Sequence, residues 1–221
     1  MKYIQKGLEP VEFIEWKALS NENWQPDWNN FQKPEKVIIH QALLNEQGYI
    51  CCYCEQRLNK TTSHIEHFKP RETYPDLTLI YNNLLCSCPG WKQGKSTDPQ
   101  EHCGASKANW FDEKFMVSPL NPDCEKDFQY TAIGEIRPNY AAPEPKAAEA
   151  TIKHCKLNHA ILIKMREEAL EGLDNLTQDE AIKLIKSYQQ RDSNDKYEVF
   201  CTVITYFLSH YYGLNKKKTN L

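Results

Sequence analysis

Three features that would place this 221-residue chain in a familiar class are missing from its sequence. No apolar run approaches the roughly 20 residues that a helix needs to cross a bilayer. The first residues, 1–6, lack the apolar segment of a signal peptide. No internal repeat is present, which disfavours a solenoid. We therefore expect a cytoplasmic globular protein with no membrane partner.

A surplus of positive charge is missing as well, because 27 Lys and Arg residues stand against 30 Asp and Glu residues, a formal net charge of −3. Proteins that hold nucleic acid by bulk electrostatics alone carry a basic footprint. That class is excluded for the chain as a whole. A nuclease is compatible with this charge if a few basic residues are well placed, or if a partner supplies much of the grip on the substrate.

Cysteine is abundant, with nine residues. An odd number in a reducing compartment argues against a disulfide framework and favours metal binding. A Cys-x-x-Cys spacing puts two thiolates on one zinc ion, and a closed shell of four thiolates stabilises a small fold without being catalytic. The expected ligands of a structural Zn²⁺ are Cys51, Cys54, Cys88 and Cys103. Two alternatives stay open: Cys86 in place of Cys88, and His102 in place of Cys103.

The pattern of short segments predicts an α+β fold. Apolar spacing and a helix-starting proline predict helices over residues 9–20 and 34–48. Extended segments at 49–54 and 63–68 are expected to pair as a hairpin, and residues 128–138 predict a second hairpin that turns at its glycine. A short helix should begin near Cys103, after a Gly- and Pro-rich stretch that we interpret as an inserted surface loop.

From residue 141 onward, apolar residues recur every three to four positions, which predicts helices. The expected helices cover residues 144–157, 159–173, 178–191 and 196–212. Thr177 and Glu180 have the spacing of a capping box. Positive and negative charges nearly balance here, so we interpret 141–221 as a packing or docking region.

A cluster of polar residues lies between the cysteines. Alternation along a strand puts His64 and Glu66 on one face, and His67 follows directly. A carboxylate can hold a divalent cation on a phosphate, and a neutral imidazole can take a proton from the attacking water. Asn83 can fix the loop around the imidazole through its amide. This combination predicts phosphodiester hydrolysis.

Four motifs follow one another: Cys-x-x-Cys at 51–54, His-Ile-Glu-His-Phe-x-Pro at 64–70, Asn-Leu-Leu at 83–85 and His-Cys-Gly-x-x-Lys at 102–107. Together they resemble the HNH endonucleases with the ββα-metal fold, in the Septu-type form called PtuB that also occurs in some retron systems. The motifs span residues 49–110. The resemblance implies a zinc-stapled HNH nuclease domain, with the chain divided into an N-terminal helical segment, the nuclease domain and a C-terminal helical partner-docking region at 1–48, 49–140 and 141–221.

The resemblance also implies a role for each matching residue. His67 corresponds to the general base, Glu66 to the acidic ligand of the catalytic cation, and Asn83 to the middle Asn of the motif. Lys107 corresponds to the basic residue of the motif helix, which is expected to contact the substrate phosphate.

One position departs from the family pattern. Gly104 stands where many HNH enzymes have the His or Asn that completes the catalytic metal site. His102 is our first candidate for the missing ligand, and His64 is the second. Gly104 also supports an alternative interpretation, a zinc-stapled module that binds nucleic acid or protein with an inactive nuclease site.

The implied reaction is one-metal hydrolysis of phosphodiester bonds with Mg²⁺ or Mn²⁺. DNA is the favoured substrate, and a ribonuclease that acts on tRNA is the second alternative. The resemblance further implies a role in antiphage defence together with an SMC- or ABC-like ATPase of the PtuA type. In retron systems, the partners would include the reverse transcriptase and its RNA–DNA product.

Overall fold

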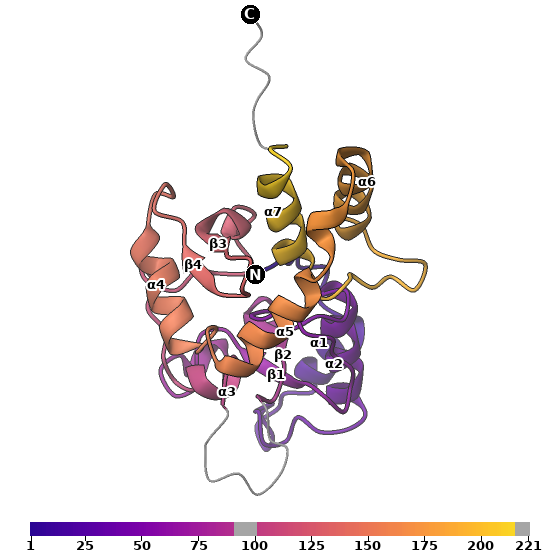
Figure 1. Ribbon diagram of the computed structural model, residues 1–221. Helices are drawn as coiled ribbons and strands as arrows, with labels where there is room; N and C mark the ends of the chain where they lie inside the picture. Colours follow the sequence, from indigo (N-terminus) through magenta and orange to yellow (C-terminus); the bar gives the residue numbers. More distant parts are fainter. Residues whose placement is uncertain (91–100, 215–221) are drawn as a thin grey trace, which may run out of the picture.

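The computed structural model describes residues 1–90 and 101–214 (Figure 1). The expected inserted loop falls largely on 91–100, outside the described residues. The two N-terminal helices are confirmed as α1 (Val11–Ala18) and α2 (Glu35–Glu46). Gly48 follows α2 with φ of +56°, and a Cβ at this position would lie 2.5 Å from the Tyr197 ring. Glycine is therefore required by both backbone conformation and space.

The first hairpin differs from the expectation. Strand β1 (His64–His67) pairs antiparallel with β2 (Leu84–Ser87), and the one-turn helix α3 (Gly104–Lys107) follows. The expected strand at 49–54 is wrong. Those residues form a tight turn between Tyr49 and Glu55, which both have positive φ values that an extended strand excludes. The order of two strands and a helix is that of a ββα unit.

Short helical turns connect the strands, and the second hairpin is confirmed. The turns are η1 (Pro75–Leu77), η2 (Tyr81–Asn83) and η3 (Cys124–Asp127). The hairpin consists of β3 (Phe128–Tyr130) and β4 (Ile136–Pro138). It turns at Gly134, where φ is +79° and a Cβ would lie 2.1 Å from the carbonyl oxygen of Ile163. Only glycine permits this close approach.

The helical C-terminal region is confirmed. It contains α4 (Pro145–His154), α5 (Ala160–Leu170), η4 (Leu173–Asn175), α6 (Gln178–Tyr188) and α7 (Cys201–Tyr211). The capping box of Thr177 and Glu180 is present. Helix α7 starts later than expected. The Asp192 side chain accepts hydrogen bonds from the amides of Asn194 and Lys196, which stabilises a turn, and Phe200, directly before α7, has a left-handed φ of 53° that a right-handed helix excludes.

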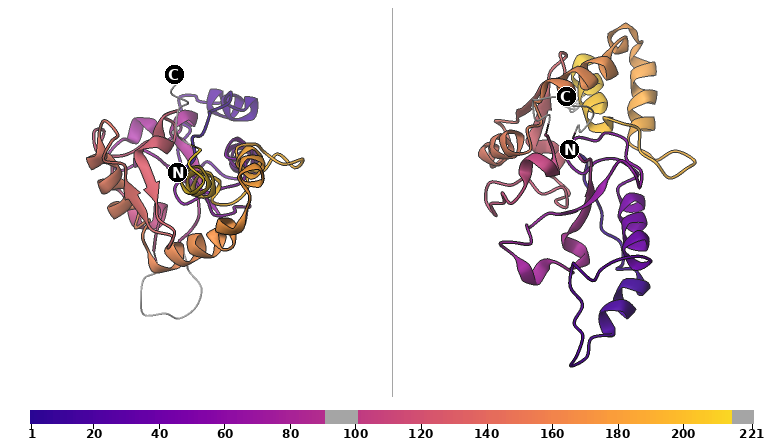
Figure 2. Two further views of the ribbon diagram at one scale, coloured as in Figure 1. Left: turned by 45° about the horizontal axis from the view of Figure 1, so that its top comes forward. Right: turned by 90° about the horizontal axis from the view of Figure 1, so that it is seen from below.

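Most of the buried apolar residues form one cluster, to which both N-terminal helices, β2, the second hairpin and the C-terminal helices contribute. Figure 1 shows β1, β2 and α3 in the lower part of the molecule beside α1 and α2, with α6 and α7 above them. The right-hand view of Figure 2 shows the same separation from another direction. Buried Glu55, next to the cysteine turn, accepts a hydrogen bond from the Thr202 amide at 2.9 Å and pairs with the Met1 amino group at 2.8 Å. In the described part of the chain, no helix is long and apolar enough to span a membrane.

Candidate active site and metal centre

Four cysteine side chains converge at one point of the fold. Their Sγ atoms all lie within 4.8 Å of one another, and all four residues are buried. The members are Cys51, Cys54, Cys88 and Cys103. Zn–S bonds of about 2.3 Å place the sulfurs of a regular tetrahedron about 3.8 Å apart. The Sγ atoms of Cys54 and Cys88 are 3.8 Å apart, so this cluster could hold a zinc ion.

Local backbone structure orients these thiols. The first two lie on the tight turn before β1, Cys88 directly follows β2, and Cys103 directly precedes α3. The Cys88 amide donates to the Cys51 sulfur at 3.3 Å. Burial opposes ionisation of the Cys51 thiol, but hydrogen bonds from the other thiols hold its pKa well below the usual range. The Cys51 sulfur is thus favoured as a thiolate, which is the form that binds a metal cation.

The two alternative zinc ligands lie outside this group of four. The Cys86 thiol approaches the His40 carbonyl oxygen at 3.9 Å. His102 lies beside the cluster, with its Nδ1 atom 3.2 Å from the Cys103 sulfur and 3.6 Å from the Cys88 sulfur. Its Nε2 atom is buried and has no hydrogen-bond partner among the described residues.

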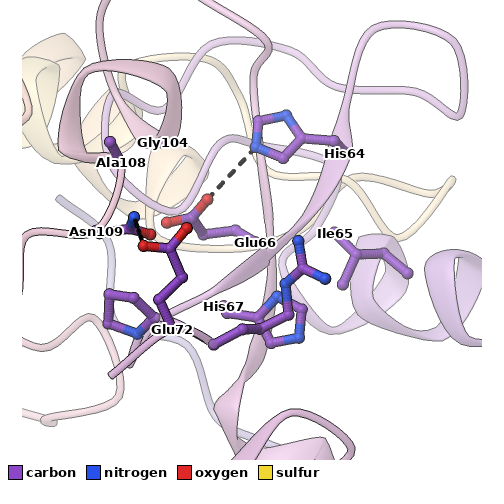
Figure 3. Close-up of a pocket in the computed structure, with 10 residues that line it drawn as sticks. His64, Ile65, Glu66, His67, Glu72, Gly104, Ala108 and Asn109 are labelled. Carbon is purple, nitrogen blue, oxygen red and sulfur yellow. Dashed lines mark hydrogen bonds and ion pairs between the residues drawn. The ribbon is translucent and has the colours of Figure 1, made fainter. Parts of the chain in front are cut away.

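Glu66 lies on β1 with only 7% of its surface exposed. Its Oε1 atom accepts a hydrogen bond from the Tyr53 hydroxyl at 3.1 Å and pairs with the Lys107 ammonium at 3.0 Å. Its Oε2 atom lies 3.4 Å from His64 Nε2, as the dashed line in Figure 3 shows. Burial opposes ionisation, but the contacts with His64 and Lys107 lower the pKa of the carboxyl group. Glu66 is therefore a carboxylate with one oxygen held and the other facing His64.

His67 follows on the same strand. Its Nε2 atom lies 3.0 Å from the Thr78 carbonyl oxygen, which can only accept, so Nε2 carries the proton and Nδ1 is the basic nitrogen. The ring packs edge-on against Trp28 at 4.3 Å between centroids. Burial lowers the pKa of His67 to about 4. The imidazole is neutral at pH 7, as a general base requires.

Asn83 fixes the loop that carries Thr78. The Asn83 side chain accepts a hydrogen bond from the Lys69 amide at 2.8 Å and donates to the carbonyl oxygens of Lys69 and Leu77 at 3.0 and 3.1 Å. These bonds join both ends of the segment between β1 and η2. Asn83 thereby positions the carbonyl group that orients His67.

A cleft of about 490 Å³ runs along this face of β1 (Figure 3). Its polar lining residues are His64, Glu66, His67, Arg71, Glu72 and Asn109. Asn109 donates a hydrogen bond to Glu72. Exposed Arg71 and half-exposed His64 offer positive or metal-binding groups at the rim. Arg71 was not singled out from the sequence, and its only signal was a basic residue directly after the Pro70 of the motif.

The expected phosphate contact of Lys107 does not agree with its position. Only 1% of this residue is exposed. The ammonium group pairs with Glu66 and donates to the His67 carbonyl oxygen at 3.1 Å. A buried carboxylate requires a countercharge, so the lysine on α3 turns inward. Lys107 is therefore a positioning residue for Glu66 and does not face the cleft.

Known proteins with sequences similar to this chain include two retron proteins and one Septu protein. No family model matches the chain. It is 29% identical over 143 residues to a Vibrio cholerae protein named as the HNH endonuclease of retron Vc95, and 28% identical over 167 residues to an Escherichia coli protein named as that of retron Ec83. It is also 32% identical over 99 residues to the Septu protein PtuB of Bacillus thuringiensis. This chain is a relative of the HNH endonucleases.

The matches to these three relatives cover part of each protein. They span 62%, 63% and 44% of this chain for Vc95, Ec83 and PtuB, respectively. They span 66%, 62% and 38% of the relatives themselves, in the same order. The chain therefore matches about two thirds or less of the length of each relative.

The departure from the HNH pattern at Gly104 has a steric reason. A Cβ at this position would lie 2.5 Å from Glu66 Oε2 and 3.0 Å from Ser87 Oγ. The long Glu66 side chain occupies the space that a side chain at 104 would need. Cys103, with φ of 56°, makes a sharp turn, after which Gly104 lines the cleft while His102 stays with the cysteines. The described contacts of the His102 ring are with the sulfurs of Cys88 and Cys103, and its expected role as a ligand of the catalytic cation stays a prediction.

Proposed function

We propose that the chain is a metal-dependent HNH endonuclease that hydrolyses phosphodiester bonds, with DNA as the favoured substrate. The observation that carries this proposal is that Glu66 and the neutral His67 ring line one cleft. Asn83 orients the base through Thr78, and Lys107 and Tyr53 hold Glu66 Oε1. The names of the relatives support the same activity.

The catalytic cation would be held by Glu66 Oε2 and His64 Nε2, which lie 3.4 Å apart. Mg²⁺ typically takes one or two carboxylates and fills its other positions with water and phosphate oxygens, so a small ligand set is sufficient. A bound Mg²⁺ or Mn²⁺ would offset the negative charge that develops on the scissile phosphate. In this proposal, His64 supplies the metal ligand that Gly104 cannot provide.

His67 acts as the general base in this proposal. Its Nδ1 atom accepts a proton from the attacking water, and the Thr78 carbonyl oxygen keeps Nε2 protonated and the ring oriented. The Trp28 ring limits access of bulk water to one side of the imidazole. The cysteine cluster has a separate role: with four thiolates on one Zn²⁺, it holds the start of α3, and thereby Lys107, against β1.

The biological setting is proposed from the relatives. Two of them are named as retron proteins and the third as a Septu protein, so we propose that this chain acts in antiphage defence with an SMC- or ABC-like ATPase, or with a retron reverse transcriptase and its RNA–DNA product. The helices after residue 141 would form the docking region. An ATPase that is encoded next to this chain and co-purifies with it would support this setting. Neighbouring genes that encode neither an ATPase nor a reverse transcriptase would contradict it.

Digestion of plasmid DNA in Mn²⁺ by the purified protein, with and without its ATPase partner, tests the activity. We expect nicking or linearisation that His67→Ala abolishes and that His154→Ala, a histidine stacked on Trp110, leaves unchanged. Cleavage of tRNA but not DNA would identify a ribonuclease. No cleavage of either substrate under any of these conditions would favour the inactive binding module.

A further inference from the structure

A second cleft of about 540 Å³ adjoins the catalytic cleft. His64 and Ile65 line both clefts, so β1 forms the wall between them. The second cleft continues along α2 and the segment before β1. Its other lining residues include Lys33, Lys36, His40 and Lys60.

The charge of this second cleft is of one sign. Three lysines line it, and no Asp or Glu of residues 1–90 and 101–214 does. Among the described residues, none of these lysines forms a salt bridge. Lys6 and Lys17, in the same N-terminal part of the chain, instead pair with Glu46 and Glu9 at 2.6 Å. Cations without a carboxylate partner, gathered in a concave surface, favour an anionic ligand.

The indole ring of Trp28 contacts one cation from each cleft lining, Lys36 and Arg71. The Lys36 ammonium lies 4.7 Å and the Arg71 guanidinium carbon 5.3 Å from the centre of this ring, which also touches His67. Burial and the nearby charge of Arg71 lower the pKa of Lys36. The aromatic ring therefore holds one cation from each cleft close to His67.

We propose that this second cleft binds the sugar–phosphate backbone of the DNA strand adjacent to the scissile phosphate, with Lys33, Lys36 and Lys60 contacting phosphate oxygens. The inference rests on the proposed nuclease function and adds a path for the substrate strand outside the ββα unit. It also explains how a chain with a net charge of −3 can hold DNA locally.

Binding of a fluorescein-labelled DNA oligonucleotide, measured by anisotropy over a salt series, tests this path. The His67→Ala background prevents cleavage during the measurement. A plot of the logarithm of the association constant against the logarithm of the salt concentration has a negative slope. Each lost phosphate contact reduces the magnitude of this slope by about 0.7 to 0.9. Lys33→Gln/Lys36→Gln/Lys60→Gln should therefore reduce the slope by about 2 to 3. Lys33→Gln/Lys60→Gln, which spares the partly buried Lys36, should reduce it by about 1 to 2.

The matched control is Lys164→Gln/Lys183→Gln/Lys186→Gln, which removes the same charge from α5 and α6. We expect its slope to stay close to that of the parent. Equal slopes for all variants, an equal fall in the control, or no DNA binding by the parent at low salt would each overturn the proposed path.

Cleavage assays of the same lysine variants with His67 intact separate this proposal from the nuclease assignment. His67-dependent cleavage with unchanged salt slopes would leave the nuclease function standing and refute the strand path. A reduced slope in a protein that cleaves nothing would support the path and refute the nuclease.

Discussion

The four sulfur atoms of the cysteine centre are buried and crowded together, whereas the neighbouring cleft contains Glu66 and His67 next to an exposed rim. The centre is defined by four identical ligands that close around one point. The cleft depends on unlike groups, in which each functional atom is held by another residue: Thr78 for His67, and Tyr53 and Lys107 for Glu66. Substitution of a cysteine ligand should therefore unfold the protein, whereas substitution of a residue in the cleft should abolish activity and leave the fold intact.

The largest expected effect is at the cysteine centre. Cys54→Ser should leave a thiolate shell incomplete and cause loss of zinc and of the folded state, because structural zinc contributes on the order of 10 kcal/mol to folding in small domains. Zinc content by elemental analysis and thermal unfolding measure this. Cys52→Ser, a buried cysteine outside the cluster, is the control. A folded, zinc-free Cys54→Ser protein would contradict the structural role.

The next effect is at His67, the proposed general base. His67→Ala should reduce DNA cleavage by about 10²- to 10⁴-fold, the usual contribution of a positioned base. Zinc content should not change, since the ring does not contact the cysteines. Cleavage rates in Mn²⁺ and elemental analysis of the same sample check both statements. Loss of zinc in this variant would mean that the cleft and the centre are one cooperative unit.

Gly104→Ala sharpens the comparison, because residue 104 lies between the two sites. The added Cβ would lie 2.5 Å from Glu66 Oε2 and must displace the carboxylate, and a misplacement of about 1 Å can reduce a rate by about 10²-fold. Gly7→Ala, where the nearest atom is Glu46 Oε1 at 3.1 Å, requires a shift of only a few tenths of an ångström and should be close to neutral. Cleavage rates and zinc content of both variants test this prediction. Full activity in Gly104→Ala would refute the proposed role of Glu66 Oε2 as a ligand of the catalytic cation.

The smallest effect concerns pH. The pKa of His67 is lowered to about 4, against about 6.5 in an unfolded chain. The unfolded state thus binds more protons between these values, so stability from the neutral imidazole is present above pH 6.5 and is lost as pH falls towards 4. Urea unfolding from pH 7 to 4.5 should show a shallower pH dependence in His67→Gln than in the parent. Identical profiles would contradict burial of a neutral ring.

The sequence by itself determined the helices and the grouping of the candidate ligands. The Cys-x-x-Cys spacing and the capping box of Thr177 act within a few residues, so their geometry follows from local backbone preferences. Glu66 and His67 are consecutive residues, so their closeness also follows from the sequence alone. The strand at 49–54 was a wrong prediction because apolar and cysteine residues in a metal-binding turn have the same composition as a short strand.

Only the tertiary structure decided which side chains share a surface. The pairing of β1 with β2, the inward turn of Lys107 and the separation of His102 from the cleft all depend on contacts between residues far apart in the chain. Gly104 is required by the length of the Glu66 side chain on another element, and Trp28 reaches His67 from a loop before α2. Such contacts follow from how volumes and charges fill one shared interior, which local spacing does not encode.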